Sequence, residues 1–470
     1  MTPRKFLSDV QPKWWVLIAV AVGSFMGTLD SSVVNVILPT MRREFGCSVA
    51  TIEWVVTIYL LVVCGFLLTF GRLGDMRGHK RLYILGFAIF TVGSAGCGLA
   101  WGVVPLIAAR ALQAVGASIL YANSAAILTT NFPASERGQA LGLQAVMVYL
   151  GSLTGPLLGG WLTDAFSWRA VFYINVPVSL IGSALCMKFI PRDEVESHRE
   201  PFDFGGASLF MAAFVLLLMG LNQGYDRGWT SLPILGLLAG AVLLLLLFVL
   251  LEHRILHPLL DLSLFRKTQF SMSVASSVLN YMAIFAILFL MPFYLIQGRG
   301  LSPGRAGIWL TIQPGVMTIC APISGILSDR IGTRRPATLG MAILGVGLVL
   351  LSLLRSDSSM TLVGLALGVT GLGTGIFVAP NTSALMGAAP AHRQGMAAGV
   401  QATARYSGMI VGIGIAGAIF TSYLTRHTPI ALFQGIRASF LVAALASFLG
   451  CFTSAIRKER FGDNIGSETT

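Results

Sequence analysis

The sequence has few charged residues, and this shortage is the first constraint on its fold. Of its 470 residues only 11% are charged and 55% are hydrophobic, whereas an ordinary soluble domain has roughly 25% charged residues. Negatively charged residues are scarcer than positively charged ones, with 20 Asp and Glu against 32 Lys and Arg. A water-soluble fold is therefore not expected.

Motifs for enzyme chemistry are also lacking. There is no glycine-rich nucleotide loop, no GxSxG elbow and no cluster of metal ligands. The six cysteines have no paired spacing, so they predict neither disulfides nor a zinc site. The six histidines all map to predicted loops, so no histidine proton relay is expected. These absences argue against an enzyme, a metal, a cofactor and ATP as an energy source.

The sequence is rich in apolar runs long enough to cross a bilayer, which takes about 20 residues. Together these runs predict an all-α polytopic membrane protein with fourteen transmembrane helices. The runs lie at about 14–38, 52–71, 82–101, 104–130, 138–162, 170–190, 204–222, 232–251, 270–297, 304–327, 336–354, 360–383, 395–420 and 433–456.

The basic residues predict the orientation of these spans. An even number of spans places both termini on one side, and most Lys and Arg lie at the termini and in the loops of that side. By the positive-inside rule, both termini are expected to be cytoplasmic, in an inner or plasma membrane. This topology accounts for the net charge of +12, so the expected partner is the lipid bilayer and not nucleic acid.

Two predicted cytoplasmic loops repeat one another. Residues 71–81 and 325–335 match at Gly, Leu, Asp, Gly and a final basic residue in one register. Aligning them predicts two parallel six-helix bundles. The predicted domains are an N-terminal bundle at 1–190, an inserted helix pair with its cytoplasmic linkers at 191–269, a C-terminal bundle at 270–456 and a cytoplasmic tail at 457–470.

The charges in these loops can latch one conformation by facing helix ends or opposite charges. Alternatively, the basic residues only anchor the loops to lipid head groups, which leaves the repeated Asp and Gly unexplained. The latch candidates are Gly71, Asp75, Arg77, Gly78, Lys80, Arg81, Asp329, Arg330 and Arg334.

Asp30 is the only acid well inside a predicted span, and Arg110 lies at a similar depth in another. An ionisable group in hydrocarbon is costly and usually marks a pathway or a proton site. We expect the two to pair, with Gln113 supporting Arg110 from one helical turn away. Asp30 is then the candidate proton-coupling carboxyl: burial favours its neutral form, whereas Arg110 favours its charged form. The alternative is a permanent ion pair that only fixes helix packing.

Four further segments, 29–39, 110–117, 151–160 and 168–177, together with the two loops, resemble the major facilitator superfamily over essentially the whole chain. More narrowly, the chain resembles the fourteen-spanner drug:proton antiporter family, although Ala114 stands where Gly is usual. The resemblance implies alternating access between two six-helix bundles around a central site. Some of these relatives carry an acid where this sequence has Thr57, so dicationic substrates are not expected. Neutral, zwitterionic or monocationic amphipathic compounds are expected instead.

Small residues every four positions in 138–162 form a stripe that the resemblance links to antiporters. They permit close helix packing, and a role in rocking or in blocking proton leak stays open. The members of this antiporter motif are Gly151, Gly155, Pro156, Gly159 and Gly160.

Polar and aromatic residues at interior depth are candidates to line a substrate cavity. For Arg405, a structural role and a transport role are both open. The candidates are Asn35, Tyr59, Tyr121, Gln144, Tyr149, Asn280, Gln313, Asn381 and Arg405.

The sequence therefore predicts a monomeric, proton-gradient-driven antiporter that exports amphipathic drugs or toxic compounds. The alternative is an exporter of one physiological substrate, such as a lipid, siderophore, peptide or metabolite, on the same scaffold. A receptor or scaffold without transport is disfavoured because Asp30 and Arg110 lie at matching depth.

Overall fold

The computed structural model describes residues 12–133, 136–191, 204–255, 262–389, 394–424 and 430–457. The described residues form helices and no strand. Their contacts divide the chain into two units. Unit 1 comprises Met1–Leu259 and Leu288–Thr311, and unit 2 comprises Leu260–Ile287 and Ile312–Thr470.

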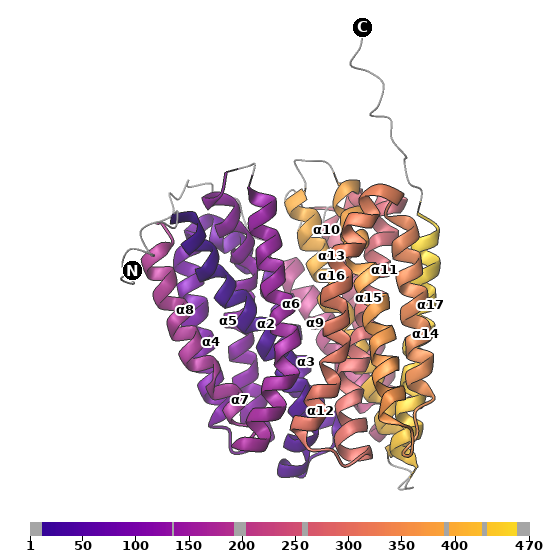
Figure 1. Ribbon diagram of the computed structural model, residues 1–470. Coiled ribbons are helices and arrows are strands. Elements are labelled where there is room, and N and C mark those ends of the chain that lie inside the picture. The colour runs from indigo at the N-terminus through magenta and orange to yellow at the C-terminus, as the bar shows by residue number, and fades with distance from the viewer. Residues whose placement is uncertain are drawn as a thin grey trace. The chain divides into compact units, whose positions relative to one another are not determined.

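Among the described residues, unit 1 contains ten α-helices, which are labelled in Figure 1, and one π-helix. They are α2 (Pro12–Phe45), α3 (Val49–Arg77), α4 (His79–Gly98), α5 (Val103–Asn131), α6 (Arg137–Ala165), α7 (Ala170–Tyr173), α8 (Asn175–Phe189), α9 (Phe204–Arg227), α10 (Leu232–Glu252), the π-helix η2 (Phe293–Gly298) and α12 (Pro303–Leu310).

Unit 2 contains the helices from the later part of the chain. They are η1 (Leu262–Arg266), α13 (Ile312–Ile331), α14 (Arg334–Ser352), α15 (Met360–Ala388), α16 (Gln394–Leu424) and α17 (Ala431–Ala455). Helix α11 (Thr268–Pro292) begins in unit 2 and ends in unit 1.

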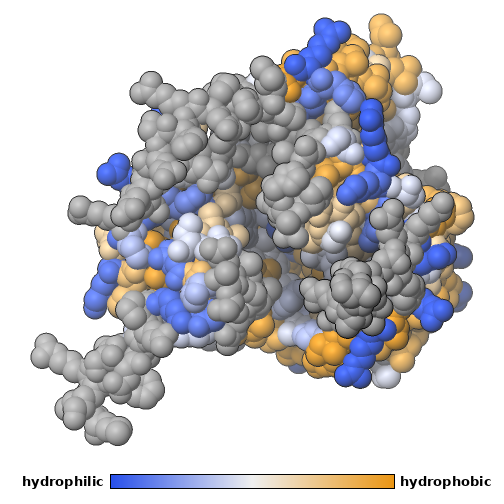
Figure 2. All heavy atoms as spheres, turned by 90° about the horizontal axis from the view of Figure 1, so that it is seen from above, coloured by the Kyte–Doolittle hydropathy of each residue, from blue (hydrophilic) through white to orange (hydrophobic). Residues whose placement is uncertain are grey.

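The predicted membrane architecture is confirmed. Thirteen helical segments among the described residues are long and apolar enough to cross a membrane, and α9 carries a shorter apolar stretch, Ser208–Leu221. Each of the fourteen predicted runs is helical over nearly all its length. In Figure 2, hydrophilic and hydrophobic residues lie side by side at this end of the helices, as expected where membrane helices meet water.

Three predicted spans are each divided into two helices: 270–297 passes from α11 into the π-helix η2, and proline explains the breaks in 170–190 and 304–327. Pro177 lacks the N–H that would bond the carbonyl of Tyr173, and α7 ends at Tyr173. Pro314 likewise leaves the carbonyl of Leu310 without its helical donor, and α12 ends at Leu310. Both breaks lie four residues before a proline, so they follow from local backbone chemistry.

Glycines allow the helices of unit 1 to pack backbone against backbone. The stripe on α6 lies against α2, where a Cβ on Gly151 would come within 2.6 Å of the Phe25 carbonyl oxygen. Gly155 and Gly159 face Ser32 and Val33 of α2 in the same way. The expected packing role of this stripe is therefore present.

Gly160 and Pro156 lie on a different side of α6 and contact α12. A Cβ on Gly160 would meet the backbone of Pro303 and Gly304, and one on Gly307 would meet the Pro156 carbonyl oxygen. The antiporter motif thus joins α6 to both α2 and α12.

The same packing recurs inside unit 2. Gly86 and Gly116 join α4 to α5, and Gly340 and Gly373 join α14 to α15 through matching backbone contacts. The repeat predicted from the two loops therefore extends into the helices that follow them.

Candidate functional site

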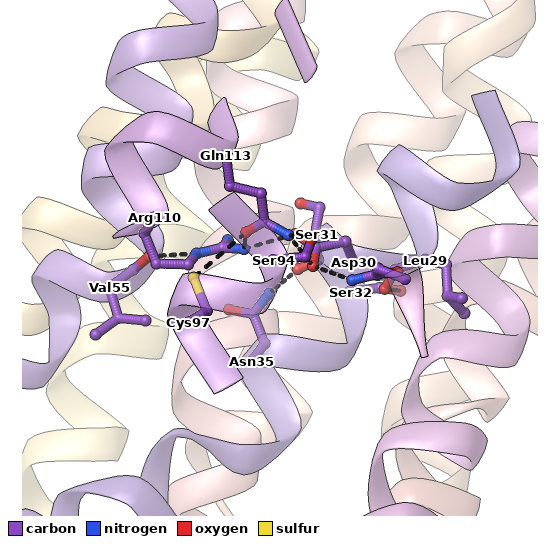
Figure 3. Close-up of polar contacts among 11 residues, drawn as sticks. Leu29, Asp30, Ser31, Ser32, Asn35, Val55, Ser94, Cys97, Arg110 and Gln113 are labelled. Atoms are coloured by element: carbon purple, nitrogen blue, oxygen red, sulfur yellow. Dashed lines mark hydrogen bonds and ion pairs between the residues drawn. The ribbon is translucent and has the colours of Figure 1, made fainter. Parts of the chain in front are cut away.

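Asp30 of α2 forms a buried ion pair with Arg110 of α5. Arg110 Nη1 donates to Asp30 Oδ2 over 2.6 Å, and the two side chains are 1% and 0% exposed, respectively. Figure 3 shows the two side chains pointing toward one another between their helices. The contact predicted from their similar depth is present.

Two amide groups complete the surroundings of the carboxylate. Gln113 Nε2 donates to Asp30 Oδ1 over 2.9 Å, and Asn175 Nδ2 of α8 donates to the same oxygen over 2.8 Å. Asp30 therefore accepts from three donors on two helices, all of them buried. Both oxygens of the carboxyl group therefore have donors in this conformation.

Arg110 has further partners besides Asp30. Its Nε donates to the Val55 carbonyl oxygen of α3 over 3.1 Å, and its guanidinium carbon lies 4.2 Å from the centre of the Tyr59 ring. The Phe172 ring of α7 lies 5.8 Å away on the same measure. The guanidinium is thus held by contacts that do not depend on the charge of Asp30.

Gln113 connects the two charged groups. Its Oε1 accepts from Arg110 Nη1 over 2.5 Å, while its Nε2 donates to Asp30 and, over 2.6 Å, to Ser94 Oγ of α4. Gly93 permits this arrangement, because a Cβ there would lie 2.5 Å from the backbone nitrogen of Gln113. Close packing of α4 on α5 therefore fixes the position of the amide.

Sequence reasoning did not assign Asn175 or Ser94 to this site. Both are uncharged polar residues inside predicted spans, and both are buried. The depth of amide and hydroxyl groups within the spans would identify Asn175, just as the depth of the charged groups identifies Asp30 and Arg110. Its position near the start of span 170–190 resembles that of Arg110 near the start of span 104–130.

The predicted latch loops form tight turns. Gly78 and Gly332 have φ of 96° and 84°, a conformation that favours glycine. Lys80 donates to the carbonyl oxygens of Met187 and Ile190 at the end of α8. A Cβ on Gly71 would contact little, with Ala122 3.9 Å away. The remaining basic candidates, Arg77, Arg81, Arg330 and Arg334, are exposed.

The side chains of Asp75 and Asp329 lie outside the described residues. The latch function of both loops accordingly stays a prediction.

The cavity candidates of unit 1 have different surroundings. Tyr59 stacks on Arg110 and so joins the ion-pair site. Asn35 Nδ2 donates to the Ser31 carbonyl oxygen over 2.8 Å, and the Tyr121 hydroxyl lies against Gly27. Gln144 Nε2 donates to two serine hydroxyls, Ser24 of α2 at 3.0 Å and Ser124 of α5 at 2.8 Å. Tyr149 is half-buried.

In unit 2 the cavity candidates contact residues of the same unit. Asn280 Nδ2 donates to Met341 Sδ over 3.4 Å, and Asn381 Nδ2 donates to the Ser273 carbonyl oxygen over 3.2 Å. Arg405 lies 5.0 Å from the ring of its neighbour Tyr406. A Cβ on Gly371 would meet the backbone of Gln313, which is itself buried.

Arg457 is buried, although the sequence predicts it to be the first residue of the cytoplasmic tail. Its Nη2 donates to Asn381 Oδ1 and to Ser454 Oγ of α17. The amide acceptor on α15 and the hydroxyl on its own last turn explain why this arginine folds inward.

The comparisons with known proteins bear on the whole chain. A family model described as the Major Facilitator Superfamily matches residues 20–413 and 273–464. The chain belongs to this superfamily. It is 37% identical over 447 residues to the riboflavin transporter RibZ of Clostridioides difficile, covering 94% of this chain and 96% of that protein.

Two drug-resistance proteins of the superfamily are also similar. The multidrug resistance protein Stp of Mycobacterium tuberculosis is 34% identical, covering 87% of this chain and 76% of that protein. The tetracenomycin C resistance and export protein of Streptomyces glaucescens is 34% identical at the same coverage. The protein is therefore a multi-pass membrane transporter by family.

Among solved structures, a peptide transporter POT in complex with sulfate matches with a TM-score of 0.68. It has 16% identity and covers 92% of this chain and 94% of that chain. At this identity the match supports the fold.

Proposed function

We propose that this major facilitator protein is a proton-coupled antiporter that exports amphipathic small molecules. The observation that carries the proposal is the buried ion pair of Asp30 with Arg110. A carboxylate buried among helices is costly unless it is paired, and in transporters such groups commonly act in proton relays.

The contacts at Asp30 support a two-state role. In the described conformation the carboxyl group of Asp30 accepts from Arg110, Gln113 and Asn175. Protonation would remove its attraction for the guanidinium, which keeps its bonds to the Val55 carbonyl and to Gln113. The two helices that carry the pair would then separate at lower cost, which links proton binding to a change of conformation.

The finer assignment is the fourteen-spanner drug:proton antiporter family, with neutral, zwitterionic or monocationic cargo. The relatives that are named for drug resistance support this class. Energy would come from the proton gradient across an inner or plasma membrane, without a cofactor. We place both termini in the cytoplasm and expect a monomer in the bilayer.

A second candidate is export of one physiological compound, and a flavin is the first to test. The relative with 37% identity is named for riboflavin transport and aligns over 94% of this chain. Riboflavin is amphipathic and neutral, so it falls within the expected class of cargo. Both candidates share the mechanism and differ in substrate range.

The test uses purified protein in vesicles with an imposed proton gradient. Ethidium and radiolabelled riboflavin are followed separately for the wild type, for Asp30→Asn and for Glu44→Gln. Glu44 is the matched control, because it is an acid of the same helix paired with Arg169 near the surface. Gradient-driven flux is expected in the wild type and in Glu44→Gln, and it should be lost in Asp30→Asn.

A second measurement separates proton coupling from a purely structural pair. Exchange of labelled substrate against unlabelled substrate, without a gradient, needs alternating access but no net proton flux. Asp30→Asn should keep this exchange. Loss of exchange together with flux would favour the structural pair, and wild-type flux in Asp30→Asn would refute the proposal.

A further inference from the structure

Besides Asp30, two further carboxyls are buried in unit 1, those of Glu53 and Glu252. Glu53 lies one turn into α3 and is 3% exposed. Among the described residues it has no hydrogen bond and no ion pair, in contrast to the three donors around Asp30. An acid in such a place requires an explanation, because an isolated charge is very costly to bury.

The start of α3 does not supply the missing donors. Ser48 caps the helix by accepting from the Thr51 amide over 3.1 Å, and the Ile52 amide donates to the Ser48 carbonyl oxygen over 3.1 Å. Glu53 follows this first turn, where the backbone amides are already bonded inside the helix. The helix dipole also fades beyond the first turn. Glu53 is therefore not a capping residue.

Arg110 lies against a different side of α3. It contacts the Val55 carbonyl and the Tyr59 ring, which are four residues apart and so share one face. Glu53 is two positions from Val55, and residues two apart on a helix do not face the same way. The positive charge of Arg110 is moreover paired with Asp30.

The other charged side chains of the helices packed against α3 are committed elsewhere or exposed. On α2, Arg42 donates to Gln297, Arg43 is exposed and Glu44 pairs with Arg169. The charged residues of α4 lie at its start, which adjoins the opposite end of α3. On α9, Arg227 is exposed, and the side chain of Asp226 lies outside the described residues.

A hydroxyl group lies one turn from Glu53 on the same face. Thr57 is 2% exposed, and its Oγ1 has no hydrogen-bond partner among the described residues. A protonated carboxyl can donate its O–H to such a hydroxyl, whereas a carboxylate at this place would have no cation to balance it. The two buried groups thus suit the neutral acid.

We propose that Glu53 and Thr57 form a second proton-binding site, separate from Asp30, in which Glu53 is protonated in the described conformation. If the proposed antiport function holds, the site has a consequence for the cycle. A conformation that exposes the start of α3 would let Glu53 release its proton to that compartment. Burying Glu53 again would require a proton from the same side, so this step would slow as that side becomes alkaline.

Infrared difference spectroscopy tests the site without substrate or gradient. Protein in nanodiscs at neutral pH should show the carbonyl stretch of a protonated carboxylic acid. Glu53→Gln should lose this band, whereas Asp30→Asn, Glu44→Gln and Glu252→Gln should retain it. A band that persists in Glu53→Gln, or its absence from the wild type, would overturn the proposal.

A second variant keeps the test decisive if Glu53→Gln does not fold. Thr57→Val preserves the shape of the side chain and removes the neighbouring hydroxyl group, so the band should shift in frequency because the surroundings of the carboxyl become less polar. An unchanged band would contradict the pairing of the two groups. Because neither measurement involves flux, failure of the Asp30 transport test would leave this result standing.

Discussion

The ion pair predicts a specific pattern of stability in a double-mutant cycle on Asp30 and Arg110. The variants are Arg110→Met, Asp30→Asn and the double variant, each compared with the wild type in nanodiscs. The cycle measures whether removal of one residue costs more stability when its partner is present than when the partner is already replaced.

The contacts set the expected magnitudes. Arg110→Met leaves the buried Asp30 with amide donors alone, and breaking one side of a buried pair costs about 3–5 kcal/mol. Asp30→Asn keeps an acceptor oxygen and leaves Arg110 its bonds to Val55 and Gln113, so its cost should be about 1–3 kcal/mol. The double variant has no unpaired acid, and its cost should fall below the sum by about 3 kcal/mol.

Buried thiols provide the assay. None of the six cysteines, which all lie among the described residues, forms a disulfide, and Cys64, Cys97 and Cys186 are buried. In a background where Ser replaces the partly exposed Cys47, Cys320 and Cys451, a thiol-reactive dye would report unfolding of the core. Because the Cys97 thiol contacts Gln113, Cys64 and Cys186 are the more neutral reporters, and a Cys97→Ala background would check this.

The outcome that would refute the reasoning is additivity. If the cost of the double variant equals the sum of the single costs within about 0.5 kcal/mol, the two residues act independently. The pair would then contribute no coupling, despite the 2.6 Å contact.

Two further predictions concern helix packing in unit 1. Gly93→Ala should lower the unfolding temperature and gradient-driven flux, because its Cβ would lie 2.5 Å from the Gln113 backbone and push α4 from α5; Gly236→Ala, with open space around it, is the control and should be neutral or slightly stabilising. Asp164→Ala should destabilise by about 1 kcal/mol, since Asp164 Oδ2 accepts from the Gly304 amide at the start of α12 over 2.9 Å; an unchanged thermal unfolding curve would contradict this capping role.

The sequence was sufficient to predict the helices because bilayer length imposes long apolar runs. The breaks after Tyr173 and Leu310 were not predicted, although Pro177 and Pro314 carry the signal four residues on. The length of an apolar run depends on side-chain hydrophobicity and not on the backbone N–H that proline lacks.

The contact between Asp30 and Arg110 could be predicted because buried charges are rare and must pair. The hydrogen bond of Asn175 to Asp30 could not be predicted from the pairing of charges, since uncharged amides are common in helix cores. Glu53 is a similar case: it is the second residue of the run 52–71 and so does not count among acids well inside a span, and only the packed structure shows that it is 3% exposed.

The two halves use one helix-packing scaffold for different chemistry. Gly93 packs on Gln113 in unit 1, and Gly347 packs on Thr370 in unit 2 in the same way. Three residues before Thr370, at the place that corresponds to Arg110, unit 2 has Leu367, which is fully buried.

Close approach of α4 to α5 therefore does not depend on the ion pair, which joins α5 to α2, because the second copy of this packing, between α14 and α15, is achieved without the arginine. If the ion pair served only to pack helices, unit 1 could also do without it. Instead, unit 1 buries two charged side chains, which costs desolvation free energy. This asymmetry favours a functional reason for Asp30 and Arg110. The asymmetry also gives a direct check. Replacing Asp30 and Arg110 together by apolar residues should preserve the fold, since unit 2 has the same helix packing without an ion pair, and should remove proton-driven flux.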